Sequence, residues 1–187
     1  RMLRGNVNAV HLGPIAGEIS LETVNEAARS NCVTLLDLQG VIRKFGIDGR
    51  ISLSRNRILP RIFEKVTIVK TGLREGEVAT RAKGAENIAS AIIDMGCKIA
   101  IITFGGKGSY VATCDGDHLS IPVVKPSKIV DYTGAGDVYA GSFLFEYSKT
   151  HDVKHSAIMA SSAVSFKVEG HSPTGFASRR EIEERAR

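Results

Sequence analysis

Two aspartates, two glycines and a threonine are gathered within seven residues in the C-terminal half of the chain. The segment Asp131-Tyr132-Thr133-Gly134-Ala135-Gly136-Asp137 runs into good helix-forming residues, so we expect Gly134–Gly136 at the start of a helix. Small residues allow a ligand close to the backbone, and the free N–H groups of a first helical turn favour an anion. A carboxylate repels phosphate, which suits Asp137 to accepting a proton from an attacking hydroxyl group. The pattern indicates phosphoryl transfer, with the amides of Gly134, Ala135 and Gly136 stabilising charge and Asp137 as base. The alternative is a simple tight turn into a helix.

A second glycine-rich segment follows an apolar run. Ile99–Thr103 is typical of a buried strand, and Thr103-Phe104-Gly105-Gly106-Lys107-Gly108 comes directly after it. Ligands of open α/β sheets bind where parallel strands end, so this segment is a candidate binding loop. It is neither a Walker loop nor a dinucleotide fingerprint, which argues against a dinucleotide-dependent oxidoreductase. The alternative is a glycine-rich turn that leads into a hairpin.

Strand-like and helix-like segments alternate along most of the chain, and this alternation predicts a mostly parallel sheet covered by helices. Ser20 is a candidate N-cap for the first helix, and the Asp115-Gly116 pair predicts a hairpin turn. From residue 135 the pattern is helical, with breaks near residue 151 and at 170–175. We predict one domain over residues 1–187. The expected strands are 7–12, 33–37, 66–70, 99–103, 109–113 and 118–123, the expected helices 21–30, 58–64 and 85–96, and residues 40–56 a loop with a short strand at 51–53.

The composition excludes several classes of protein. Of the 187 residues, 43% are hydrophobic, and no run approaches the roughly 20 apolar residues of a membrane helix. Cys32, Cys97 and Cys114 are too scattered for a zinc site or a disulfide framework, which favours a cytoplasmic protein. The net charge of +5 suits an anionic ligand, but the basic residues form no stripe with interleaved aromatics, which argues against nucleic-acid binding.

Segment 131–137, with Gly141 behind it, closely resembles the second signature of the ribokinase-like (PfkB) sugar-kinase family, and the chain from about residue 7 to 185 resembles its archaeal-type members. The resemblance implies a ribokinase-like three-layer αβα sandwich with a mostly parallel central sheet and a β-hairpin. It also implies ATP as donor, Mg²⁺, and a sugar or nucleoside as acceptor. Segment 103–108 is similar to the Thr-x-Gly-x-x-Gly nucleotide loop of the family, which assigns nucleotide contacts to Thr103, Gly105, Gly106 and Gly108.

Residues 70–75 fall where the family keeps an Asn-x-x-Glu motif. Glu75 matches the glutamate that helps to organise magnesium, whereas Gly72 replaces the asparagine, and Thr71 offers a substitute oxygen in the nucleotide site. The resemblance also implies that Thr133 contacts the nucleotide and that Asp131 takes part in holding a cation, including a monovalent one such as K⁺.

The opening portion of the family, with its first Gly-Gly signature and its lid, has no counterpart here. We therefore expect the C-terminal, nucleotide-binding and catalytic part of a kinase, which as a truncated chain is expected to be inactive alone. The sheet edge left by the absent portion suggests a homodimer. Two alternatives remain open: a hydroxymethylpyrimidine- or pyridoxal-type kinase of the same fold, and a nucleotide-binding fragment without turnover.

Overall fold

The computed structural model describes residues 7–29, 32–171 and 176–187. The chain divides into two compact units. The first comprises Arg1–Phe104 and Tyr110–Leu119, and the second comprises Gly105–Ser109 and Ser120–Arg187.

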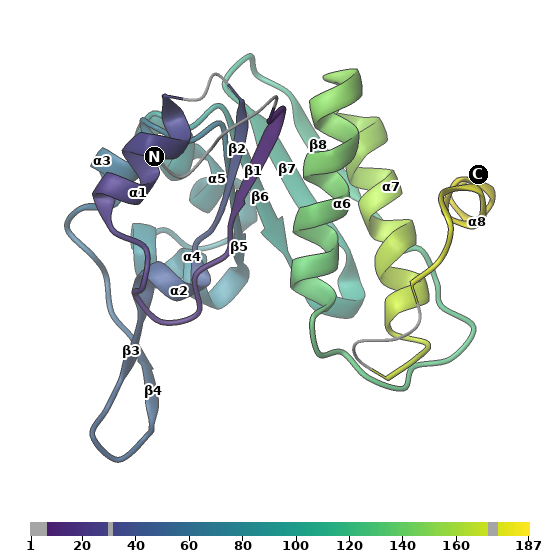
Figure 1. Cartoon of the computed structure of the whole chain (residues 1–187), viewed down its shortest axis with the longest axis horizontal. Helices are drawn as coiled ribbons and strands as arrows, with labels where there is room; N and C mark the ends of the chain where they lie inside the picture. Colours follow the sequence, from purple (N-terminus) through teal and green to yellow (C-terminus); the bar gives the residue numbers. More distant parts are fainter. Residues whose placement is uncertain (1–6, 30–31, 172–175) are drawn as a thin grey trace. The chain divides into compact units, whose positions relative to one another are not determined.

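Six strands of the described chain form one sheet in the order β1-β2-β5-β6-β7-β8 (Figure 1). The pairs β1/β2, β2/β5 and β5/β6 are parallel. The last two strands are adjacent and joined by a tight turn in which Gly116 has a φ of 98°. These strands are β1 (Ala9–Leu12), β2 (Val33–Asp37), β5 (Ile68–Gly72), β6 (Ile99–Thr103), β7 (Ser109–Thr113) and β8 (His118–Ile121), and a separate antiparallel pair is formed by β3 (Arg43–Phe45) and β4 (Ile51–Leu53).

The helices between these strands pack on an apolar core. Strand residues such as Leu36 and Val69 are fully buried and belong to one cluster with Phe63, Ile88 and Ile92 from the helices. Continuous apolar strands of this kind fit a parallel sheet with both faces covered. The helices of the first unit are α1 (Leu21–Ala28), α2 (Gln39–Ile42), α3 (Leu59–Phe63), α4 (Leu73–Thr80) and α5 (Ala85–Asp94).

Most of the predicted elements are confirmed. The strands at 33–37, 99–103 and 109–113 have the predicted bounds, and the Ser20 side chain caps α1 by accepting the N–H of Thr23 at 3.2 Å. The strand predicted at 66–70 is wrong by two residues, because the chain pairs with β6 as far as Gly72. Helices α2 and α4 and strand β3 were not predicted. The predicted helix end at residue 30 and part of the break at 170–175 lie outside the described residues.

The second unit contains a pair of antiparallel helices, α6 (Ala135–Thr150) and α7 (Val153–Lys167), joined by two residues, and a shorter helix α8 (Arg179–Arg185) (Figure 1). Helix α8 begins with a capping box formed by Ser178 and Glu181. The short 3₁₀ turn η1 (Gly105–Lys107) also belongs to this unit.

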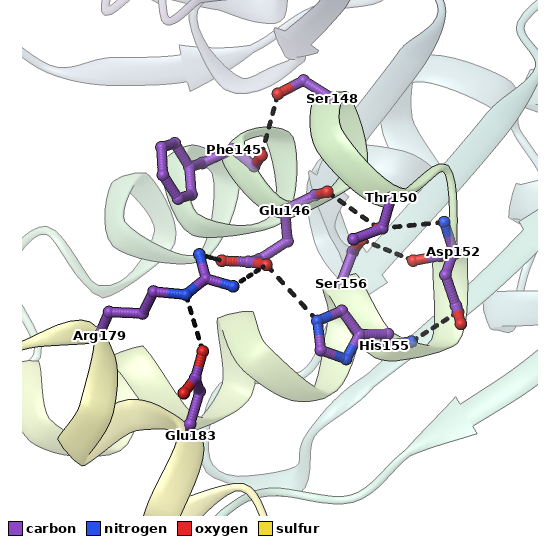
Figure 2. A network of polar contacts seen from close by, with 9 residues as sticks. All are labelled: Phe145, Glu146, Ser148, Thr150, Asp152, His155, Ser156, Arg179 and Glu183. Carbon is purple, nitrogen blue, oxygen red and sulfur yellow. Dashed lines mark hydrogen bonds and ion pairs between the residues drawn. The ribbon is translucent and has the colours of Figure 1, made fainter.

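A buried carboxylate ties the three helices of this unit together (Figure 2). The side chain of Glu146, on α6, is 5% exposed and accepts two hydrogen bonds from Arg179 of α8, at 2.7 and 3.1 Å. The same carboxylate lies 3.4 Å from Nε2 of His155 on α7, and Arg179 also pairs with Glu183. Two parallel N–H···O bonds fix direction as well as distance, so this pair holds α8 in a defined place.

In the described ranges no helix combines the length and the apolar character needed to cross a membrane.

Candidate functional site

The segment before α6 forms the turn that the sequence predicted. Gly134 is the N-cap of α6 and has a φ of 78°, a left-handed conformation that glycine adopts without strain. The N–H of Thr133 donates to Oδ1 of Asp131 at 2.8 Å, and the N–H of Ala135 donates to the carbonyl oxygen of Tyr132 at 3.0 Å. The loop is therefore held by its own side chain and backbone.

Two amides at this helix start remain available to a ligand. Among the described residues no acceptor is recorded for the N–H groups of Gly136 and Asp137, as expected for a first helical turn. Gly136, Asp137 and Thr133 are exposed. Free N–H groups and the positive end of a sixteen-residue helix make this turn suited to an anion, with the Asp137 carboxylate in the same turn.

The glycine-rich segment 105–108 lies beside this helix. Ser109, directly after the segment, shares a buried hydrogen bond of 2.8 Å with the hydroxyl group of Tyr139 on α6. Burial raises the pKa of Tyr139 to about 12, although the hydrogen bond with Ser109 lowers it, so the phenol stays protonated. Either hydroxyl group can be the donor in this bond. This bond ties the residue after the glycine-rich segment to the second turn of α6. The Ser109–Tyr139 link was not predicted, and only the position of Tyr139 two residues after Asp137 could have suggested it.

Gly108 has a structural reason to be glycine. Its φ is 91°, and an added Cβ would clash with the carbonyl oxygen of Ile121 and lie 3.1 Å from the N atom of Val123. Gly105 and Gly106 have open space where a Cβ would stand. Gly108 thus shapes the loop, whereas the other two glycines leave its outer side open.

The remaining predicted residues lie in the first unit, at the carboxyl ends of neighbouring parallel strands. Thr71 is fully buried, and its carbonyl oxygen accepts the hydroxyl of Thr103 at 3.3 Å. Glu75 is in the first turn of α4, and its carboxylate lies so close to Gly72 that a Cβ there would be 2.5 Å from Oε2. Gly72, the departure from the family motif, therefore makes room for the Glu75 carboxylate at the N-terminus of α4.

A buried ion pair joins the same strand ends and was not predicted beyond the position of Asp37. Nζ of Lys70 lies 2.6 Å from Oδ2 of Asp37, and both residues are less than 10% exposed. Oδ1 of Asp37 accepts the N–H of Gln39 at 3.3 Å. The pair therefore links the residues after β2 to strand β5, which leads to Glu75.

The described residues contain no group of three or more His, Cys, Asp or Glu side chains that could hold a metal ion. Carboxylate oxygens are suitable ligands for Mg²⁺, which commonly takes only one or two of them and completes its shell with water and substrate phosphates. Glu75 and Asp131 fit that donor chemistry, each as a single carboxylate in its own unit.

A hollow of about 240 Å³ lies between α6, α7 and α8. Phe145, Met159 and Ile182 give it apolar walls, and its charged residues, Glu146 and Arg179, are already paired with each other. We therefore place no ligand there.

Comparison with known proteins identifies the family of the chain. The model of the pfkB family carbohydrate kinases matches residues 19–179. The cytidine kinase of Thermococcus kodakarensis is 33% identical over 141 residues, which cover 74% of this chain and 47% of that protein. The nucleoside kinase of Methanocaldococcus jannaschii is 41% identical over 69 residues, 37% of this chain and 22% of that protein. The chain therefore spans about half the length, or less, of these curated relatives.

Solved structures show the same fold. The nucleoside kinase of Burkholderia thailandensis in complex with inosine superimposes with a TM-score of 0.79 at 22% identity, over 98% of this chain and 56% of that one. A pyrophosphate-dependent kinase in the ribokinase family, complexed with a pyrophosphate analog and myo-inositol, gives a TM-score of 0.83 at 21% identity, over 98% of this chain and 64% of that one. The predicted ribokinase-like α/β fold is confirmed.

Proposed function

Because the chain belongs to the pfkB family of carbohydrate kinases, we propose that it is the nucleotide-binding and catalytic part of a kinase. This kinase transfers the γ-phosphoryl group of ATP to a hydroxyl group of a sugar or nucleoside. The observation that carries the proposal is the start of α6, where the free amides of Gly136 and Asp137 share one turn with an exposed carboxylate.

Asp137 is the general base. Its carboxylate accepts the proton of the acceptor hydroxyl while the hydroxyl oxygen bonds to the γ-phosphorus, and the bond from that phosphorus to the bridging oxygen breaks so that ADP leaves. The free amides of Gly136 and Asp137, and that of Gly134, donate hydrogen bonds to the transferred group as negative charge spreads over its oxygens, whereas the amide of Ala135 is already bonded to Tyr132. Gly134 keeps this turn open because its left-handed conformation carries no steric penalty.

The nucleotide lies along the second unit, with the 105–108 loop and Thr133 at its phosphates. Thr71 and Thr103 are proposed nucleotide contacts of the first unit, considered by itself. Glu75 in the first unit and Asp131 in the second unit each offer a carboxylate to a magnesium ion, which would be held largely through water and would neutralise phosphate charge. Asp131 with Thr133 and the carbonyl groups near Val168 is the proposed place for a monovalent cation such as K⁺.

A nucleoside is the first acceptor to test. The relatives from Thermococcus kodakarensis and Methanocaldococcus jannaschii are a cytidine kinase and a nucleoside kinase, and the Burkholderia thailandensis structure holds inosine. Pyrophosphate belongs in the donor panel beside ATP, because one structural neighbour is a pyrophosphate-dependent kinase.

The decisive experiment replaces Asp137 by Asn. The change keeps the size of the side chain and removes the base, so turnover is expected to fall by about two to four powers of ten while the affinity for ATP and Mg²⁺ stays within about twofold. Turnover of the variant and of the unchanged protein is compared in the longest form of the protein that phosphorylates an acceptor. Their affinities for ATP and Mg²⁺ are measured by calorimetry on the 187-residue chain. The matched control is Asp115→Asn in the exposed turn between β7 and β8, which should change neither quantity.

Equal losses of binding and turnover in Asp137→Asn would contradict the role of Asp137 as base. Gly136→Val tests the amides themselves, because the larger side chain blocks the approach of an anion to the helix start. Nucleotide binding that survives Gly136→Val in a folded protein would place the phosphates elsewhere.

A further inference from the structure

Lys167 is a buried lysine whose ammonium group has no partner. It is the last residue of α7, it is 1% exposed, and in the part of the chain that the structure describes Nζ makes no hydrogen bond or ion pair. Lys70 offers a contrast, since it is similarly buried but paired with Asp37 at 2.6 Å. Removing an ammonium group from water without a counter-charge costs several kcal/mol, so an unpaired one calls for an explanation.

Lys167 ends the helix that packs beside α6, so its backbone lies near the start of α6. Helices α6 and α7 run antiparallel and are joined by two residues at one end, so the last turn of α7 lies beside the first turn of α6 (Figure 1). The backbone agrees with this arrangement. The carbonyl oxygen of Val168, the next residue, accepts the N–H groups of Val130 and Asp131 at 2.7 and 3.3 Å. The backbone that follows Lys167 is therefore tied to the residues that begin segment 131–137.

None of the described carboxylates near the start of α6 pairs with Lys167. Glu169, two residues on, pairs with Arg185 at 2.7 Å and also accepts the N–H of Ser127. Asp131 accepts the N–H of Thr133, and Asp137 is exposed at the start of α6. The counter-charge that Lys167 lacks is the kind of group that a helix N-terminus binds, an anion.

We propose that Lys167 supplies a fixed positive charge behind the 131–137 loop that strengthens the binding of a polyphosphate at the start of α6. It acts together with the free amides of Gly136 and Asp137, and in a water-poor setting its charge is screened less than that of a surface lysine. The inference rests on the proposed function, because the polyphosphate is that of the phosphoryl donor. It makes Lys167 a positioning residue for the donor rather than a group that reacts.

The test replaces Lys167 by Met, which has a similar length and no charge. Affinities of the 187-residue chain for inorganic tripolyphosphate and for adenosine are measured by calorimetry, and the melting temperature by circular dichroism. Binding of tripolyphosphate is expected to weaken about tenfold, while binding of adenosine stays unchanged. The melting temperature should stay or rise, because an unpaired buried charge has been removed. The matched control is Lys154→Met, which removes an exposed lysine from the other end of the same helix.

Unchanged tripolyphosphate affinity in Lys167→Met would overturn the inference, and so would a loss of folding, since removal of an unpaired charge should not destabilise the chain. Those outcomes leave the proposed function standing if Asp137→Asn still abolishes turnover. If the unchanged chain bound neither ATP nor tripolyphosphate, both proposals would fall.

Discussion

Gly108→Ala is expected to destabilise the second unit, and Gly106→Ala is its matched control. At Gly108 the φ of 91° is unfavourable for alanine, and the new Cβ would clash with the carbonyl oxygen of Ile121, the last residue of β8, and crowd backbone atoms just after it. At Gly106 a Cβ would meet nothing within 4 Å. Although both positions lie in the same glycine-rich loop, only position 108 requires glycine for steric reasons.

The expected size of the effect follows from two costs. A non-glycine residue in the left-handed region costs about 1–2 kcal/mol. Forcing a methyl group against backbone that cannot move aside adds about 1–3 kcal/mol. Together these give about 2–5 kcal/mol for Gly108→Ala, or a melting temperature lower by about 4–20 °C in a chain of this length. Gly106→Ala should stay within about 0.5 kcal/mol of the unchanged protein.

Both variants are then titrated with ATP and Mg²⁺. If the 105–108 loop lies against phosphate, the methyl group of Gly106→Ala blocks that approach and lowers the affinity although the fold is intact. A Gly108→Ala protein that melts like the unchanged chain would refute the steric argument. A Gly106→Ala protein with normal affinity would refute the assignment of this loop to the nucleotide.

Two further predictions concern the attachment of α8. Arg179→Met should lower the free energy of unfolding by about 1–2 kcal/mol in urea titrations, because it strands the buried Glu146 carboxylate; the figure is below the usual 3–5 kcal/mol since the Arg179 side chain is 49% exposed. Partial burial raises the pKa of Glu169, but the Arg185 guanidinium outweighs it and holds that pKa below 4.5. The pair therefore contributes stability above about pH 4.5 that is lost as the pH falls through the lowered pKa, and Glu169→Gln should remove this part of the acid dependence of the melting temperature.

Local chemistry made much of the fold predictable. The strands at 33–37 and 99–103 are apolar runs bounded by polar or glycine residues, and in a parallel sheet such runs have few alternatives. The turn before α6 was predictable for a similar reason. Glycines at a helix start limit the backbone to a few conformations, and Gly134 adopts one that other residues avoid.

Helix α4 was missed because its determinants are tertiary. Its sequence contains Gly76 and has few apolar residues, and its N-cap is Gly72 with no side-chain cap. Gly76 is explained only by packing, since a Cβ there would lie 2.7 Å from Cγ2 of Ile88 on α5. Strand β4 was predicted at 51–53, but its partner β3 was not. Both strands are three residues long and mostly exposed, and Phe45 and Ile51 become neighbours only through the register of the pair.

The two buried lysines show why part of the site could not be predicted. Lys70 and Lys167 both interrupt otherwise apolar or small-residue segments, and the sequence gives no means to tell them apart. The fold separates them. Parallel pairing of β2 and β5 places Asp37 opposite Lys70, whereas Lys167 ends α7 beside the start of α6 and has no carboxylate partner among the described residues. A buried charge with its partner holds the protein together, and its removal should cost stability. Removal of a buried charge without a partner should lower ligand affinity instead. We therefore expect Lys70→Met to lower stability, and Lys167→Met to lower the affinity for polyphosphate without lowering stability.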